Sequence, residues 1–162
     1  MQIRKLARPL LFVIPAVGAL LFGLVSIVDA GQPTKYQVTV SDSSSGFVVE
    51  TIPPLVADDI YKVGFANNSV ESHVLVVVGG LQPGITEDEF ADILDAVGAG
   101  APPPEGAFEA GAVFAKPGQD HQKLFDVTTT GQYGFFCPIP GPDGTLHYKQ
   151  GFIGLFTVVE FP

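Results

Sequence analysis

The sequence predicts an all-β fold: a Greek-key β-sandwich that carries one inserted helix and follows an N-terminal transmembrane helix. Short segments in which apolar and polar residues alternate recur after residue 33, and Gly or Pro residues separate them. The chain has 19 Gly and 14 Pro, which suits a fold built from many short strands and turns. Its 162 residues are enough for one domain with its own core and an accessory segment. We therefore expect a membrane anchor over residues 1–30 and one β domain over residues 31–162.

The N-terminal segment has the pattern of a membrane anchor. Residues 9–28 contain no charged side chain, and Arg4, Lys5 and Arg8 precede them. At about 1.5 Å per residue, such a run spans a hydrocarbon core of roughly 30 Å as a helix. The basic residues predict a cytoplasmic N-terminus, so we expect a single-pass protein of the cell membrane with its C-terminal domain on the extracytoplasmic side. A cleaved signal peptide is the alternative, because residues 28–30 resemble a small-residue cleavage site.

The first half of the β domain contains four segments with strand patterns. Residues 36–40 alternate between apolar and polar side chains, as a half-buried strand does. Residues 42–46 are a turn, after which residues 47–52 extend again until a Pro pair stops them. Residues 61–65 alternate in the same way. Residues 73–78 are almost continuously apolar, which predicts a strand covered on both faces.

A helix is predicted over residues 86–97. Thr86 and Glu89 form the Thr-x-x-Glu pattern of a capping box, and acidic residues follow Thr86, where the helix dipole favours them. Apolar residues recur at i, i+3, i+4 and i+7, which gives one apolar stripe: Phe90, Ile93, Leu94 and Val97. Gly98 and Gly100 end the pattern. We expect this helix to cover one end of the sandwich.

The second half of the domain returns to strand patterns. Residues 113–114 start a strand and residues 124–127 mark the next one. Alternation along the following strand points Tyr133, Phe135 and Cys137 to one face. A loop with Pro, Gly and Asp-Gly signals follows, and residues 151–160 form the last strand.

Charge limits the partners of the domain. The net charge is −9, and all 17 acidic residues follow the apolar run. A field of this sign repels nucleic acid, so we expect no nucleic-acid partner. It would attract a protein with a basic docking face, although the solubility of an exported domain explains the same charge.

One thiol and two imidazoles stand out as candidate metal ligands. Cys137 is the only cysteine, so the chain has neither an internal disulfide nor the two bridging thiolates of a binuclear copper centre. His73 begins an apolar segment and His147 ends the loop that follows Cys137. One thiolate and two imidazoles supplied by a β-rich domain are the equatorial ligands of a type 1 (blue) copper centre. His121 lies in a polar stretch, and we expect it to be an exposed loop residue.

These residues resemble the cupredoxin (plastocyanin/azurin-like) family, over residues 33–162. The resemblance rests on the early His73, on the segment Tyr133-Gly134-Phe135-Phe136-Cys137-Pro138, and on His147 followed by Gly151-Phe152-Ile153-Gly154. It implies that His73, Cys137 and His147 bind one type 1 copper ion. The axial methionine of the family aligns with Phe152, which cannot ligate. Gln150 is the alternative axial ligand, because glutamine fills that role in some blue copper sites.

The resemblance implies a membrane-tethered protein that carries single electrons between redox partners outside the cytoplasm, and no enzymatic activity. A metal-free accessory subunit of a membrane redox complex is the alternative, because Phe152 replaces methionine and nine residues separate Cys137 from His147. Nucleophilic catalysis by Cys137 would need an orienting third residue, and none is apparent. Copper nitrite reduction would need a second site made of histidines, and the chain has three in all.

Overall fold

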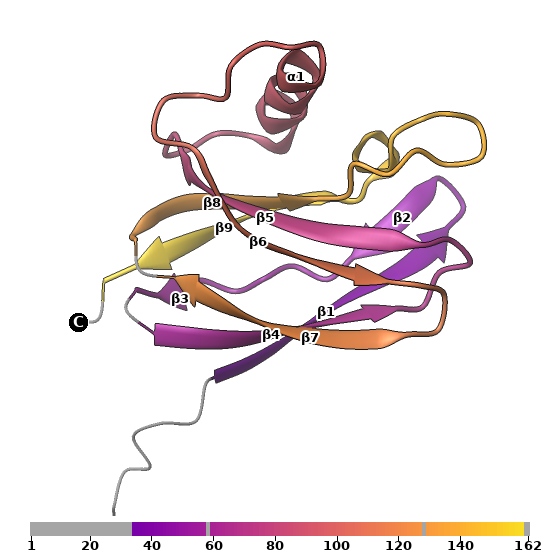
Figure 1. The fold of residues 1–162 in the computed structure, drawn as a ribbon, viewed down its shortest axis with the longest axis horizontal. Helices are drawn as coiled ribbons and strands as arrows, with labels where there is room; N and C mark the ends of the chain where they lie inside the picture. The colour runs from indigo at the N-terminus through magenta and orange to yellow at the C-terminus, as the bar shows by residue number, and fades with distance from the viewer. Residues whose placement is uncertain (1–33, 58, 128, 161–162) are drawn as a thin grey trace, which may run out of the picture. The chain divides into compact units, whose positions relative to one another are not determined.

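The computed structural model describes residues 34–57, 59–127 and 129–160, and these residues belong to the compact unit Gln32–Pro162. They form two facing β-sheets and one α-helix, so the predicted all-β sandwich with an inserted helix is confirmed (Figure 1). The strands are β1 (Thr34–Ser43), β2 (Gly46–Val49), β3 (Leu55–Val56), β4 (Asp59–Asn67), β5 (His73–Leu81), β6 (Phe108–Ala115), β7 (Asp120–Val127), β8 (Gly131–Phe136) and β9 (Ile153–Val159). The helices are α1 (Glu87–Gly98) and the single 3₁₀ turn η1 (His147–Gln150).

The predicted transmembrane helix falls on residues outside those that the structure describes. Within the described ranges, no helix combines the length and the apolar character needed to cross a membrane.

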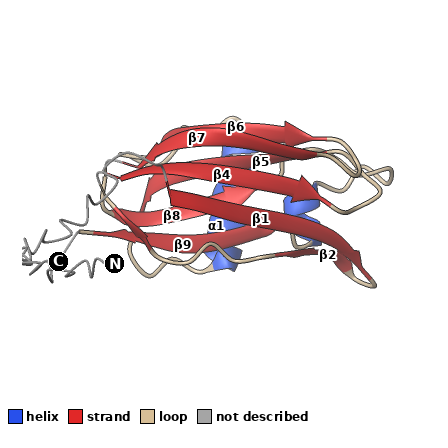
Figure 2. Cartoon of the chain, turned by 90° about the horizontal axis from the view of Figure 1, so that it is seen from below, coloured by secondary structure: helices blue, strands red, loops and turns tan. Residues whose placement is uncertain are grey.

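The strands form two sheets, and the chain passes from one sheet to the other several times. The first sheet has the order β2-β1-β4-β7 and the second has the order β3-β9-β8-β5-β6. Most neighbours are antiparallel, but β1 pairs with β4, and β3 with β9, in parallel. Figure 2 shows the layers from below, with α1 behind the strands. These two parallel pairs join segments that the sequence pattern alone does not bring together.

The core lies between the two sheets and consists of their inward-facing side chains. Burial alternates along β5, where every second residue from His73 to Leu81 is buried. This is the pattern of a strand with one face in the core. The apolar residues of its other face, Val74, Val76 and Val78, are half-buried. Val76 and Val78 line a cavity of about 290 Å³ beneath α1. The expectation of a strand covered on both faces therefore holds only partly.

Helix α1 covers the outer face of the second sheet, not one end of the sandwich as expected from the sequence (Figure 1). Both hydrogen bonds of the predicted capping box between Thr86 and Glu89 are present. Phe90 is the buried anchor of the helix, and its ring lies edge-on to Phe136 with 5.9 Å between centroids. Gly134 makes room for this anchor, because a Cβ there would lie 2.4 Å from a ring carbon of Phe90.

The segment after Cys137 differs from the predicted loop and strand. Residues 147–150 form η1, which ends at Gly151 with a φ of +96°. This left-handed conformation favours glycine, and it turns the chain into β9.

The strand predicted to start at residue 113 begins earlier, at Phe108.

Candidate metal centre

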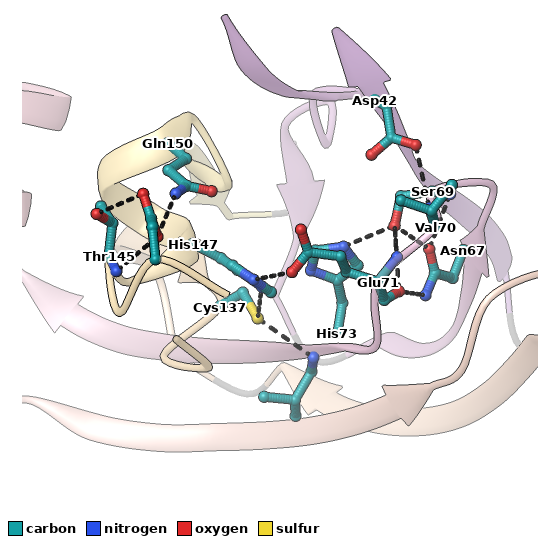
Figure 3. Close-up of polar contacts among 12 residues, drawn as sticks. Asp42, Asn67, Ser69, Val70, Glu71, His73, Cys137, Thr145, His147 and Gln150 are labelled. Carbon is teal, nitrogen blue, oxygen red and sulfur yellow. Dashed lines mark hydrogen bonds and ion pairs between the residues drawn. The ribbon is translucent and has the colours of Figure 1, made fainter. Parts of the chain in front are cut away.

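The structure brings His73, Cys137 and His147 together (Figure 3). His73 is the first residue of β5, Cys137 follows β8 directly, and His147 is the first residue of η1. All three side chains are buried, and one ligand atom from each lies within 4.8 Å of the others. Because β5 and β8 are paired neighbours in the second sheet, the sheet itself brings the first imidazole close to the sulfur.

The loop between Cys137 and His147 folds back on itself like a hairpin. The N–H of His147 donates to the carbonyl of Ile139 at 2.9 Å, and the N–H of Tyr148 donates to the carbonyl of Cys137 at 3.1 Å. These bonds bring the sulfur of Cys137 within 3.5 Å of Nδ1 of His147. A loop that is long in sequence therefore does not separate the two donors in space.

Gln150 is the last residue of η1, and its side chain lies against the turn of this hairpin. Asp143 accepts the backbone N–H of Thr145 at 2.8 Å, and the amide nitrogen of Gln150 lies 3.4 Å from the same Asp143 oxygen. A Cβ built on Gly141 would have the amide nitrogen of Gln150 and Nε2 of His147 as near neighbours. The amide thus lies toward the outer edge of His147, whereas the edge facing Cys137 is the Nδ1 side (Figure 3).

His73 is oriented by a chain of buried hydrogen bonds. Its Nε2 lies 2.8 Å from the hydroxyl of Ser69, and that hydroxyl lies 2.8 Å from Oδ1 of Asn67. The Asn67 amide nitrogen donates to the carbonyls of Ala115 and Glu71, so its oxygen is the acceptor and Ser69 donates to it. The hydroxyl is then free to accept the Nε2 proton of His73, which leaves the lone pair of the neutral ring on Nδ1.

Nδ1 of His73 is buried and has no hydrogen-bond partner. Among the described residues, every other buried side-chain nitrogen or oxygen has one. Such an atom is costly unless something binds it. Three donors at about 2.0–2.3 Å from one ion in a plane would be about 3.5–4 Å apart. The 3.5 Å between Cys137 and His147 fits this spacing. The residues present therefore fit a bound metal ion, and one sulfur with two imidazole nitrogens suits copper.

Burial controls the protonation of the donors. Burial raises the pKa of the Cys137 thiol, and the charge of Glu71 raises it further. Hydrogen bonds from the backbone N–H groups of Val74 and Ile139 favour the thiolate and partly oppose this rise. Burial, followed by repulsion from His147, lowers the pKa of His73 to about 4. His73 is thus neutral at neutral pH, as ligation requires, and a bound cation would offset the cost of the Cys137 thiolate.

Aromatic rings enclose the three donors. The ring of Phe47 lies edge-on to both imidazoles, with 4.6 Å to His73 and 4.9 Å to His147 between centroids. Phe152 is fully buried with its ring 5.0 Å from that of His73. This enclosure keeps water from the donors, which in metal sites tunes the potential.

Sequence reasoning missed three residues of the site: Phe47, Ser69 and Glu71. Ser69 and Glu71 carried a signal, because polar residues just before a buried histidine are candidates for its hydrogen bonds. Phe47 carried none, because its place opposite the imidazoles depends on how the two sheets pack. His121 lies in β7 and is exposed, and its Nε2 lies 3.2 Å from Gln119. The prediction that His121 lies in a loop was wrong, and the prediction that it is exposed and outside the site is confirmed.

No protein-family model matches the chain, and no curated protein sequence matches it. Among solved structures, dithionite-reduced auracyanin from the photosynthetic bacterium Roseiflexus castenholzii matches 80% of this chain and 99% of its own, with 24% identity and a TM-score of 0.53. Auracyanin B matches 80% of this chain and 91% of its own, with 22% identity and a TM-score of 0.51. The multicopper oxidase McoA from Aquifex aeolicus matches 78% of this chain but 29% of its own, with 10% identity and a TM-score of 0.51. These matches confirm the cupredoxin-like fold.

Proposed function

We propose that the chain is a type 1 copper protein that carries single electrons between redox partners outside the cytoplasm. The observation that carries the proposal is the unpartnered, buried Nδ1 of His73. It belongs to a side chain that offers a ligand atom within 4.8 Å of ligand atoms of Cys137 and His147. The resemblance in fold to an auracyanin described in a dithionite-reduced state supports a redox role. Both auracyanin chains are covered almost completely, so the match in fold extends over nearly the whole of each solved chain.

His73, Cys137 and His147 would hold the ion. Bound copper supplies the exchange of one electron between its two common oxidation states. The chain contributes donors that are already held in place by the Ser69 hydroxyl and by the backbone bonds of the Cys137–His147 hairpin. Donors that do not move between the two states reduce the reorganisation that electron transfer requires.

The axial position is proposed to have no protein ligand. Phe152, which aligns with the axial methionine, is buried beside His73. Gln150, the alternative ligand, directs its amide toward Asp143. An apolar ring beside the donors would exclude water and would donate no electron density to a bound ion.

Titration of the full chain with copper(II), followed by its visible spectrum, tests the proposal. We expect binding of one ion per chain and an intense thiolate-to-copper absorption, which reduction bleaches reversibly. A chain that binds no copper would overturn the proposal and favour a metal-free accessory subunit of a membrane redox complex. The variant His121→Asn is the matched control, because it removes the exposed histidine that lies outside the site.

The partner is proposed to be a redox protein with a basic docking face. Helix α1 carries three acidic residues in its first turn and no basic residue in its last. At its other end, Asp95 bonds to Tyr148 and Lys149, which follow His147 in η1. The acidic helix is therefore attached to the segment that supplies a donor. We expect the rate of electron transfer from a basic haem protein to fall steeply with ionic strength, and a rate independent of salt would contradict this partner class.

Tethering by residues 1–30 is part of the proposal and rests on their sequence. The full chain expressed in a bacterium should be found in the membrane fraction with an intact mass that includes these residues. A mature mass that lacks about thirty N-terminal residues would identify a cleaved signal peptide instead.

A further inference from the structure

A carboxylate covers the outer edge of the second imidazole. Nε2 of His147 lies 3.0 Å from Oε2 of Glu71, although the two residues are 76 positions apart in the sequence (Figure 3). The side chain of His147 is 1% exposed and that of Glu71 is 28% exposed. Glu71 therefore stands between the imidazole and the solvent, on the side opposite the sulfur of Cys137.

The backbone of Glu71 is held by the network that orients His73. Its N–H donates to the hydroxyl of Ser69 at 3.2 Å, and its carbonyl accepts from the amide of Asn67 at 2.7 Å. The N–H of the preceding residue, Val70, donates to a carboxylate oxygen of Asp42 at 3.0 Å. The Glu71 side chain thus starts from a constrained segment, so its contact with His147 is built into the loop before β5.

A carboxylate fixes which nitrogen of the imidazole carries the proton. An ionised carboxylate only accepts hydrogen bonds, so the nitrogen that faces Glu71 must be the donor. In the neutral ring this leaves the lone pair on Nδ1, which lies 3.5 Å from the sulfur of Cys137. Ser69 does the same for His73 with a neutral hydroxyl. The neutral ring of each imidazole is therefore left with its lone pair on Nδ1 for the same reason, but through acceptors of different charge.

We propose that Glu71 is a positioning residue, which fixes the tautomer and the ring orientation of His147 as a donor and places a negative charge next to the site. Hydrogen bonds to the far nitrogen of a metal-bound histidine orient the ring and raise its basicity. The influence on a metal rests on the proposed function, whereas the tautomer of His147 does not. A negative charge at this distance favours the more oxidised, more positive state of a bound ion.

The tautomer is tested without metal, by nitrogen-15 NMR of the histidine rings of the metal-free full chain at mildly alkaline pH. We expect His147 to carry its proton on Nε2. Glu71→Gln should keep this signature, because the amide carbonyl still accepts the proton. Glu71→Leu should shift His147 toward a mixture of tautomers. A proton on Nδ1 in the unaltered protein, or a Leu variant with an unchanged signature, would overturn the proposal.

The charge is tested on the copper-loaded protein. Glu71→Gln should raise the reduction potential and retain the visible absorption, whereas Glu71→Leu should raise the potential and also shift or weaken the absorption. Glu50→Gln is the matched control, because it removes an exposed carboxylate from the segment just after β2, and should shift the potential by less. Equal shifts for Glu50→Gln and Glu71→Gln would contradict a specific role. If copper does not bind at all but the NMR result stands, the proposed function fails while the positioning of His147 by Glu71 is retained.

Discussion

The backbone N–H of Val74 donates a hydrogen bond to the sulfur of Cys137 at 3.4 Å. Val74 follows His73 in β5, so one strand supplies a donor imidazole and also stabilises negative charge on the donor sulfur. The pairing of β5 with β8 sets this contact, because Val76 lies opposite Phe136, the residue before Cys137. The first two donors are thus arranged by sheet register, and the hairpin after Cys137 adds the third.

Replacement of the sulfur should remove the optical signature of the site. In Cys137→Ser we expect no intense visible absorption on addition of copper(II), because a hydroxyl cannot provide the thiolate-to-copper transition. Copper affinity, measured by calorimetry, should fall at the same time, because copper prefers a soft thiolate ligand. An unchanged spectrum in Cys137→Ser would show that Cys137 is not a ligand.

Substitutions of Phe152 and Gln150 distinguish an axial position without a protein ligand from one that Gln150 fills. In Phe152→Met, a sulfur donor would add electron density that stabilises copper(II), so the reduction potential should fall. In Gln150→Leu, the potential should stay within the scatter of the unaltered protein, because its amide is directed to Asp143. Protein-film voltammetry measures both. A clear rise in Gln150→Leu would identify Gln150 as an axial ligand and contradict the proposed open position.

The stability of the metal-free protein should depend on pH through His73. Its pKa is about 4 in the folded protein and 6.5 in an exposed chain. Between these values the unfolded chain binds a proton that the folded protein does not, so stability falls as the pH is lowered from 6.5 toward 4. The shift corresponds to about 3 kcal/mol of unfolding free energy when complete. Urea unfolding of the metal-free protein at several pH values measures this loss.

The variant His73→Asn separates this contribution from other titrating groups. It removes the imidazole, so the decline of stability between pH 6.5 and 4 should be shallower than in the unaltered protein. Equal slopes in the two proteins would show that His73 does not keep a lowered pKa.

The packing of α1 on the second sheet predicts the effect of two glycine substitutions. In Gly134→Ala the new Cβ would lie 2.4 Å from a ring carbon of Phe90, and over-packing of this kind costs about 1–3 kcal/mol. In Gly98→Ala the new Cβ meets no atom within 4 Å, so the helix end should be unaffected or slightly more stable. Thermal unfolding compares the two, and equal melting temperatures would contradict the described contact of Phe90 with β8.

The sequence by itself determined the local features of this protein. Alternation marked the strands, the Thr86–Glu89 pair marked the start of the helix, and the types of donor pointed to His73, Cys137 and His147. These signals are readable because each depends on neighbouring residues or on side-chain chemistry. The structure confirmed the fold class that these signals predicted.

Only the tertiary structure decided how distant segments meet. The contact of Glu71 with His147 joins positions 76 residues apart, and Phe47 reaches both imidazoles from a strand of the other sheet. Whether Gln150 points to the donors or away from them depends on the Asp143 turn, and the face that α1 covers depends on the fit of Phe90 over Gly134. These outcomes follow from packing and strand register across the whole domain, which no local pattern encodes.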